Sequence, residues 1–199
     1  MHVIPQHPAL DLANKHGLVR ARELALVGAA GGTLQQLLKT GSLVRVGRGV
    51  YAPAGRTPTE LDHLGPIAIK YPRLVFCLLT ALQLHGLTTQ SPHEVWVAVA
   101  QKARAPSIDH PPLRVVRMTD VDYGIATVAI DGVVRIPVTD VAKTIADCFK
   151  FRNKIGLDVA LEALRDAWQQ KKVTMNEVWQ AAEHCRVANV MRPYLESLV

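Results

Sequence analysis

Apolar and polar positions follow a helical spacing over the first forty residues and then change to the spacing of a hairpin. The pattern predicts short helices over residues 9–16, 19–27 and 33–40, each followed by a glycine that favours a helix end. Residues 43–52 are expected to form two short strands, because apolar positions flank a glycine-rich tip at 47–49. Three helices followed by a basic hairpin are typical of a winged helix-turn-helix.

The third predicted helix has one apolar face and one polar face. Leu34, Leu37 and Leu38 stand at positions i, i+3 and i+4, so they form one buried stripe. In a helix-turn-helix this helix lies in the major groove of duplex DNA and reads base edges with its outer face. Glutamine pairs with adenine, threonine contacts base edges or the thymine methyl group, and lysine meets guanine or phosphate. The residues of this helix expected to contact DNA are Thr33, Gln35, Gln36 and Lys39.

Four arginines are expected to complete the DNA-binding surface. Arg45 lies in the hairpin and Arg48 at its tip, where two glycines allow close approach to a DNA backbone or minor groove. Arg20 and Arg22 stand near the start of the second helix, where they would hold phosphates without reading sequence. The alternative is that the glutamines form only a solvated helix face and that the tip arginine is only a turn residue.

The pattern changes after residues 53–59, a segment rich in proline, glycine and threonine that is the best linker in the chain. We therefore expect an N-terminal winged helix-turn-helix domain, 1–57, and a larger C-terminal domain, 58–199. The second domain is expected to be α+β, with a small, mostly antiparallel sheet, a hairpin turn at 131–132, a capping box at 174–177 and a helical end. Its helices are expected at 60–70, 74–85, 139–149, 158–170, 174–185 and 190–198, and its strands at 95–100, 113–118, 127–130 and 133–137.

The distribution of charge supports this division. The chain has a formal net charge of +6, and residues 1–57 hold seven basic and two acidic side chains, which leaves +5 there. The other 142 residues hold 16 basic and 15 acidic side chains, a net charge of +1. Such asymmetry is typical of a module that binds a polyanion. A basic surface that only keeps a small domain soluble would have the same composition.

The sequence does not favour a membrane protein, a secreted protein or a metalloprotein. No apolar run is long enough to span a membrane, and the N-terminus lacks the pattern of a secretory signal, so we expect a cytoplasmic protein without membrane contact. Cys77, Cys148 and Cys185 are far apart and form no CxxC motif, so we expect them to be reduced and buried. No cofactor or metal site is expected.

No known catalytic motif occurs in the second domain. The chain lacks a Walker loop, HExxH, GxSxG and a Rossmann glycine pattern, so we expect no enzyme and no catalytic residue. His85 is expected to cap the end of its helix. Asp140, Lys143 and Asp147 are expected on an exposed helix face, in pairs spaced i, i+3. The basic cluster 150–154 is interpreted as a solvated loop, or else as a contact with DNA flanks or RNA.

Several segments resemble the AbiEi family, the antitoxin components of bacterial AbiE-type (type IV) toxin–antitoxin systems. The resemblance begins in the wing segment 43–51 and continues in order through residues 75–87, 92–96, 139–152 and 157–164. It therefore extends over most of the chain. The wing motif alone occurs in many winged helices, and the segments taken together are more specific.

This resemblance implies a repressor with two roles. The N-terminal domain would bind its own promoter as double-stranded DNA and repress the operon, and the C-terminal domain would counter a toxin resembling a nucleotidyltransferase. Direct contact with the toxin and a homodimer on DNA stay open. The first helix is short, which also leaves open whether residues of the second domain complete its packing. The alternatives are a stand-alone winged-helix regulator whose C-terminal domain dimerises or senses a ligand, and an enzyme acting on nucleic acid.

Overall fold

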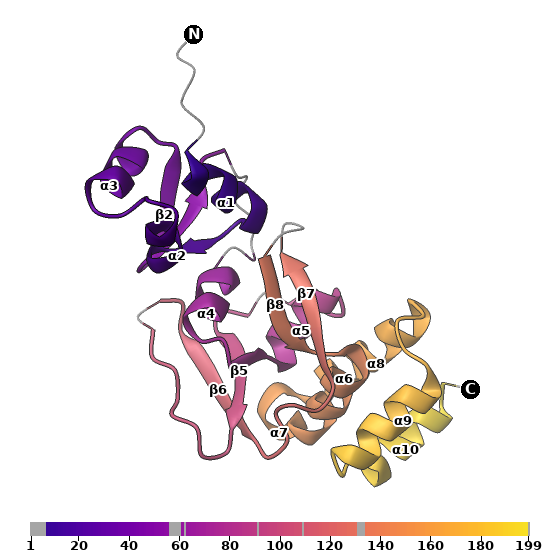
Figure 1. The fold of residues 1–199 in the computed structure, drawn as a ribbon. Coiled ribbons are helices and arrows are strands. Elements are labelled where there is room, and N and C mark those ends of the chain that lie inside the picture. Colours follow the sequence, from indigo (N-terminus) through magenta and orange to yellow (C-terminus); the bar gives the residue numbers. More distant parts are fainter. Residues whose placement is uncertain are drawn as a thin grey trace. The chain divides into compact units, whose positions relative to one another are not determined.

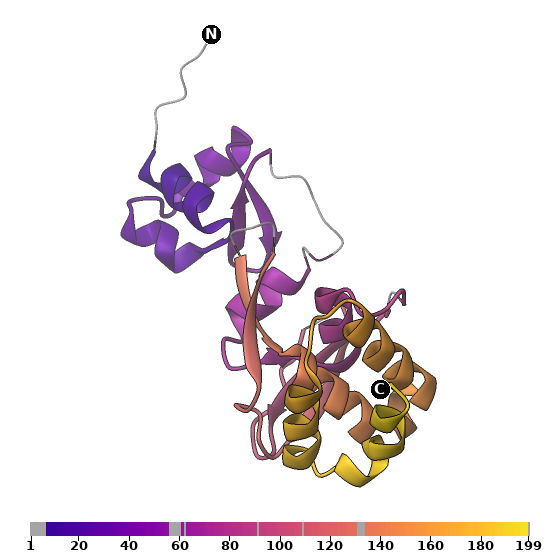
Figure 2. The same cartoon turned by 90° about the vertical axis from the view of Figure 1, so that its right-hand side faces the viewer.

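The α+β class expected from the sequence is the class of the structure. The computed structural model describes residues 7–55, 61, 63–90, 92–108, 110–130 and 134–198. The chain forms two compact units, each built from two segments (Figures 1 and 2). Unit 1 comprises Met1–Pro72 and Ala129–Ile136, and unit 2 comprises Arg73–Val128 and Pro137–Val199.

Two expectations fall outside the described residues. The domain boundary expected at residue 57 lies in the stretch 56–60, and the hairpin turn expected at 131–132 lies in the stretch 131–133. Both therefore stay predictions. The contacts of the described residues nevertheless continue unit 1 beyond residue 57, because the helix at 64–70 belongs to it.

Unit 1 begins with the predicted winged helix-turn-helix. Its sheet has the strand order β1-β3-β2, and both pairings are antiparallel. Gly17, at a φ of 67°, ends the first helix, as its lack of a Cβ permits. The elements are α1 (Pro8–His16), β1 (Val19–Arg20), α2 (Ala21–Leu26), α3 (Gly32–Lys39), β2 (Leu43–Gly47) and β3 (Val50–Pro53).

The second helix is shorter than expected because its first two residues form a strand. Val19 pairs with Tyr51 and Arg20 with Val50, so residues 19–20 add a third strand to the hairpin. Helix α2 then begins at Ala21, and the Glu23 carboxylate accepts a hydrogen bond of 2.7 Å from the Arg20 backbone N–H. The helical spacing of 19–27 was misleading here, since pairing with β3 outweighs local helix propensity.

Helix α4 (Leu64–Lys70) packs directly on the winged helix within unit 1. A Cβ added at Gly65 would overlap Leu18 Cδ1 and would lie 3.4 Å from Val134 Cγ1. A Cβ added at Gly47 would lie 3.2 Å from Pro66 Cβ. Glycines at these two positions therefore allow α4 to lie close to the winged helix. Residues beyond the predicted first domain therefore complete the packing of the winged helix.

Unit 2 contains most of a five-stranded sheet with the order β6-β5-β4-β8-β7. The β4/β5 pairing is antiparallel, whereas the β4/β8 and β5/β6 pairings are parallel. The sheet is thus mixed, where the sequence suggested a mostly antiparallel one. The strands are β4 (Val75–Phe76), β5 (Val95–Ala100), β6 (Leu113–Met118), β7 (Ile125–Ile130) and β8 (Val134–Thr139).

In this five-stranded sheet, β4 is the strand that the sequence did not predict. Residues 74–85 are almost uniformly apolar, and the sequence favoured one helix over all of them, but the first residues pair with β5 and β8. A short strand buried on both faces has no alternation to reveal it. Leu78, at a φ of 46°, marks the change from strand to helix.

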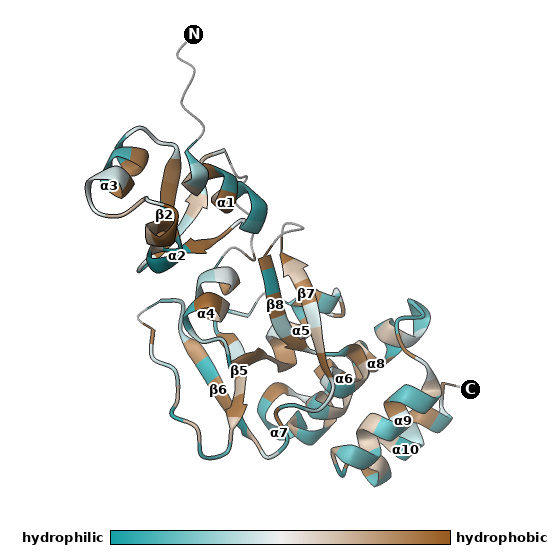
Figure 3. Cartoon of the chain, in the orientation of Figure 1, coloured by the Kyte–Doolittle hydropathy of each residue, from teal (hydrophilic) through white to brown (hydrophobic). Residues whose placement is uncertain are grey.

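Helices cover this sheet and form the end of the chain. Helix α5 packs on β5, and α6 packs on α5, α8 and α9. In Figure 3 brown covers much of α5 and β5, while α9 and α10 carry both teal and brown. The helices are α5 (Leu78–His85), α6 (Val141–Lys150), α7 (Arg152–Ile155), α8 (Leu157–Gln169), α9 (Met175–His184) and α10 (Ala188–Glu196).

Two local expectations are confirmed in unit 2. Thr174 and Glu177 form the predicted capping box at the start of α9. The three cysteines are free and buried. The interpretation of the cluster 150–154 as a loop, by contrast, is corrected, because residues 152–155 form the short helix α7. Among the described residues, no helix is long and apolar enough to cross a membrane.

Candidate nucleic-acid interface

Helix α3 presents a polar outer face on an apolar support. Leu37 is buried, and Leu34 and Leu38 are half-buried against the core of the winged helix. Gln35, Gln36 and Lys39 are exposed. A rotation of 100° per residue places these three side chains together, opposite the leucines. Thr33 is half-buried, so it lies at the edge of this face.

The turn before α3 depends on glycines at two positions. Gly28 has a φ of 84° and Gly31 a φ of 50°, a region that disfavours a side chain. Between them, buried Ala29 donates its N–H to the Leu24 carbonyl at 2.9 Å, which closes the end of α2. The two helices of the motif are therefore joined by a tight turn.

The wing presents its two predicted arginines to solvent. Arg48 is exposed at the hairpin tip, and Gly49 there has a φ of 74°. Arg45 is also exposed, and its Nε donates a hydrogen bond of 3.2 Å to the Gly47 carbonyl. The Ala21 N–H donates to the Gly49 carbonyl at 2.9 Å, so the wing tip is tied to the start of α2.

The electrostatics of this surface favour a polyanion. No Asp or Glu occurs between Glu23 and Glu60, a stretch that contains α3 and the whole wing. The same stretch contains Lys39, Arg45 and Arg48. A DNA backbone approaching α3 and the wing would therefore meet cations and uncharged side chains, and no carboxylate from either element.

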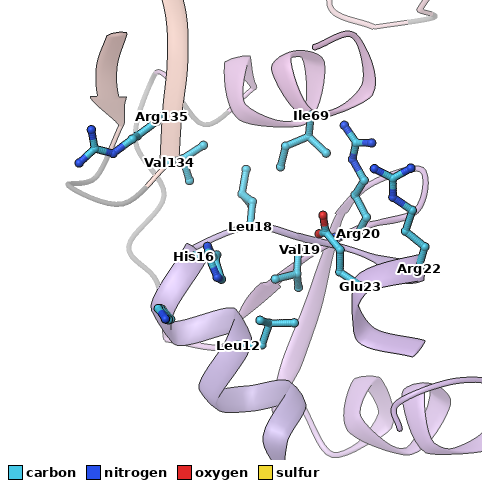
Figure 4. Close-up of a pocket in the computed structure, with 11 residues that line it drawn as sticks. Leu12, His16, Leu18, Val19, Arg20, Arg22, Glu23, Ile69, Val134 and Arg135 are labelled. Atoms are coloured by element: carbon cyan, nitrogen blue, oxygen red, sulfur yellow. The ribbon is translucent and has the colours of Figure 1, made fainter. Parts of the chain in front are cut away.

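Arg20 and Arg22 lie in a different environment from the α3 face. Arg20 is half-buried at the start of α2, and Arg22 is exposed one residue into the helix. Both line a pocket whose opposite wall includes Ile69 of α4 (Figure 4). The structure therefore separates the eight predicted contact residues into three groups, on α3, on the wing and on this pocket.

The sequence analysis missed three other basic residues that line the same pocket. They are Lys15 and His16 at the end of α1 and Arg135 in β8. Lys15 is one of the seven basic residues counted in the first domain, whereas His16, a neutral histidine in that count, gave no such signal. Arg135 lies more than a hundred residues away in sequence, and only the fold brings it to this unit.

A buried charged cluster in unit 2 corrects the expectation for α6. Lys143 and Asp147 are 4% and 1% exposed and form an ion pair at i, i+4, so they do not lie on a solvated face. Helices α5, α8 and α9 surround this part of α6, which leaves little of it exposed. Asp140 instead caps α6, since its Oδ1 accepts from the Lys143 N–H at 2.7 Å.

The cluster has the electrostatics of a structural ion pair. Burial raises the pKa of Asp147 above its ordinary value, and the positive charge of Lys143 opposes that shift. Burial also raises the pKa of the Cys185 thiol to about 11, and the charge of Asp147 adds to the effect. A thiol with such a pKa stays protonated near neutral pH and is a poor nucleophile. Among the described residues, no group of His, Cys, Asp and Glu could hold a metal ion.

His85 also differs from its expected role. Its Nε2 lies 2.7 Å from the Thr139 carbonyl, so the imidazole joins α5 to the end of β8. Burial lowers the pKa of His85, which favours the neutral ring that donates this hydrogen bond. The end of α5 is closed instead by Gly86 in the left-handed conformation and by Lys172, which donates to the His85 carbonyl.

The order of elements in unit 1, its acid-free outer face and its basic wing define a winged helix-turn-helix of the kind found in DNA-binding regulators. Residues 7–54 match the family described as "Transcriptional regulator, AbiEi antitoxin". The resemblance inferred from the sequence is therefore confirmed over this segment, which corresponds to the winged helix.

A solved structure resembles nearly the whole chain. The crystal structure of the RV2827C protein from Mycobacterium tuberculosis superposes with a TM-score of 0.55 and covers 96% of this chain and 79% of that one. At a sequence identity of 13%, this superposition shows a shared fold alone. No curated protein matches the chain.

Proposed function

We propose that the chain is an AbiEi-type antitoxin that binds its own promoter and represses the operon that encodes it. The observation that carries the proposal is the outer face of α3, where Gln35, Gln36 and Lys39 are exposed together on a helix-turn-helix. The acid-free wing and the match of residues 7–54 to a family of transcriptional regulators support it. Thr33, Arg20, Arg22, Arg45 and Arg48 are proposed as flanking contacts.

The test replaces the three exposed residues of α3 with alanine in the full chain. Gln35→Ala, Gln36→Ala and Lys39→Ala together remove the base-reading groups and leave the buried leucines in place. We expect the triple variant to lose specific binding to the upstream DNA of its own gene in a mobility-shift assay. Each good bidentate contact contributes roughly 1–3 kcal/mol to discrimination, so loss of two would reduce specific affinity by at least about 30-fold.

A matched control is available in unit 2. Gln169, Gln170 and Lys171 are exposed at the end of α8 and have the same side chains as the α3 set. Their replacement by alanine removes equal charge and should leave the mobility shift unchanged. If the α3 variant shifted the DNA as well as this control does, another surface would have to read the operator.

The second part of the proposal concerns the toxin. We propose that unit 2 counters a nucleotidyltransferase-like toxin encoded beside this gene. Co-expression of the full chain should restore growth of cells that express the neighbouring protein, and the α3 triple variant should still do so, because it alters unit 1 only. Failure of the full chain to rescue growth would favour a stand-alone regulator whose second unit dimerises or senses a ligand.

A further inference from the structure

Unit 1 contains a basic pocket that the proposed DNA surface does not use fully. It has a volume of about 830 Å³ and lies among α1, β1, α2, α4 and the first residues of β8 (Figure 4). All eleven lining residues belong to unit 1. We call it the basic pocket; its lining residues are Leu12, Lys15, His16, Leu18, Val19, Arg20, Arg22, Glu23, Ile69, Val134 and Arg135.

The charges that line the basic pocket are strongly unbalanced. The lining residues include four cations, Lys15, Arg20, Arg22 and Arg135, and a single carboxylate, that of Glu23. This carboxylate already accepts the Arg20 backbone N–H at 2.7 Å. The ion pairs found among the described residues lie in unit 2, and none involves these four cations. The pocket therefore has an excess of three positive charges, with His16 as a further donor.

The remaining wall is apolar. Leu18, Val19 and Val134 are buried, and Leu12 and Ile69 are half-buried. Figure 4 shows Leu18 and Ile69 between Arg20 and Arg22 on one side and the strand that carries Val134 on the other, with the Arg135 side chain directed away from Leu18. Pockets of roughly 300–1,000 Å³ with an apolar wall and a few convergent polar groups are typical of small-molecule sites. A flat or convex duplex would reach the rim of such a pocket but not its apolar wall.

We propose that the basic pocket binds an organic polyphosphate, a compact polyanion that carries an aromatic or apolar body, of the nucleoside triphosphate class. Guanidinium groups match phosphate oxygens in bidentate geometry, and Lys15 adds a point charge. The apolar wall accommodates the body of the ligand. Arg20 and Arg22 lie at the start of α2, the first helix of the helix-turn-helix. A polyphosphate bound to these two arginines therefore lies next to the proposed DNA surface, and it lowers the affinity of the protein for DNA.

The test is calorimetric titration of the full chain, in the absence of DNA, with ATP, inorganic tripolyphosphate and adenosine. We expect binding of ATP, at least about tenfold weaker binding of tripolyphosphate and no detectable binding of adenosine. No binding of either phosphate compound would overturn the proposal. Equal affinity for ATP and tripolyphosphate would overturn the role of the apolar wall.

Variants separate this site from the DNA surface. Lys15→Gln together with Arg135→Gln should weaken ATP binding by at least about tenfold, since two phosphate partners are lost. Neither residue belongs to the predicted DNA contacts. The control, Lys102→Gln with Arg104→Gln, removes the same charge from exposed residues of unit 2 and should not change ATP affinity. If ATP affinity fell equally in the two variants, the effect would come from net charge alone, and the proposed site would be wrong.

Binding of ATP is tested independently of the proposed promoter binding, and only its effect on DNA affinity rests on that proposed function. The Lys15 and Arg135 variant should still shift promoter DNA, and the α3 triple variant should still bind ATP. If the chain shifted no DNA but bound ATP through the pocket, the proposed function would fail and this inference would stand. Mutual displacement of ATP and duplex DNA is expected, because coupling between two ligands is reciprocal. If the pocket variant lost DNA binding in parallel with ATP binding, the pocket would belong to the DNA interface and the inference would fail.

Discussion

At the scale of single residues, the Lys143–Asp147 pair is the most constrained feature of unit 2. Both side chains are buried, and their charges have been removed from water. Such removal costs several kcal/mol per ion, which only a close partner and further hydrogen bonds can offset. Asp147 has two such partners, Lys143 and the Cys185 thiol, whose Sγ lies 3.7 Å from Oδ1.

Replacing one member of the pair should therefore be much worse than replacing both. We expect Lys143→Met to lower the free energy of unfolding by about 3–5 kcal/mol, because it leaves a buried carboxylate without its cation. The double variant Lys143→Met, Asp147→Leu should recover most of this loss. Urea unfolding of the three proteins measures both effects. A single variant as stable as the wild type would show that the pair is solvated.

The pH dependence of the Lys143→Met variant follows from the same pair. Without Lys143 the effect of burial is opposed only by the weaker influence of Lys150 and Cys185, so the pKa of Asp147 in the folded variant rises further above its unfolded value. Between those two pKa values the folded state binds more protons than the unfolded state, and stability increases as pH falls. The deficit of the single variant should shrink between pH 7 and pH 5, whereas the double variant, which lacks this carboxylate, should show no such trend.

At the scale of elements, the sequence predicts well wherever amphipathic spacing and a cap agree. Helix α9 begins where the capping box places it, and the hairpin of β2 and β3 surrounds the glycine tip. The failures occur where tertiary contacts decide. Residues 19–20 and 75–76 are strands only because distant strands pair with them. Neither pairing has a local signal that would distinguish it from helix.

The candidate site shows the same limit. The outer face of α3 could be predicted because three leucines fix its orientation through local spacing. The basic pocket could not, since it needs α4 and β8 beside α1 and α2. The burial of Lys143 and Asp147 was equally invisible, because charged residues spaced along a helix usually lie in solvent. Only the helices around α6 reverse that expectation.

At the scale of the whole molecule, the winged helix does not form a unit by itself. Helix α4 and residues 129–136 complete it, although the family match ends at residue 54. The closest approach is at Gly65, where an added Cβ would overlap Leu18 Cδ1. Leu18 is 5% exposed, so its side chain has little room to move away. A larger residue at position 65 must therefore disturb unit 1 from outside the matched segment.

We expect Gly65→Val to lower the free energy of unfolding by roughly 1–3 kcal/mol, as overpacking of a filled interior typically does. Adding Leu18→Ala to this variant should restore part of the loss, because the smaller side chain vacates the space that the new methyl groups need. Denaturant unfolding of the wild type, the two single variants and the double variant gives the coupling between the positions. If α4 contacts the winged helix as described, the double variant will be more stable than the sum of the two single effects predicts. Strict additivity would mean that α4 and the winged helix are independent, and that residues 7–54 need nothing further to hold their DNA-binding surface in place.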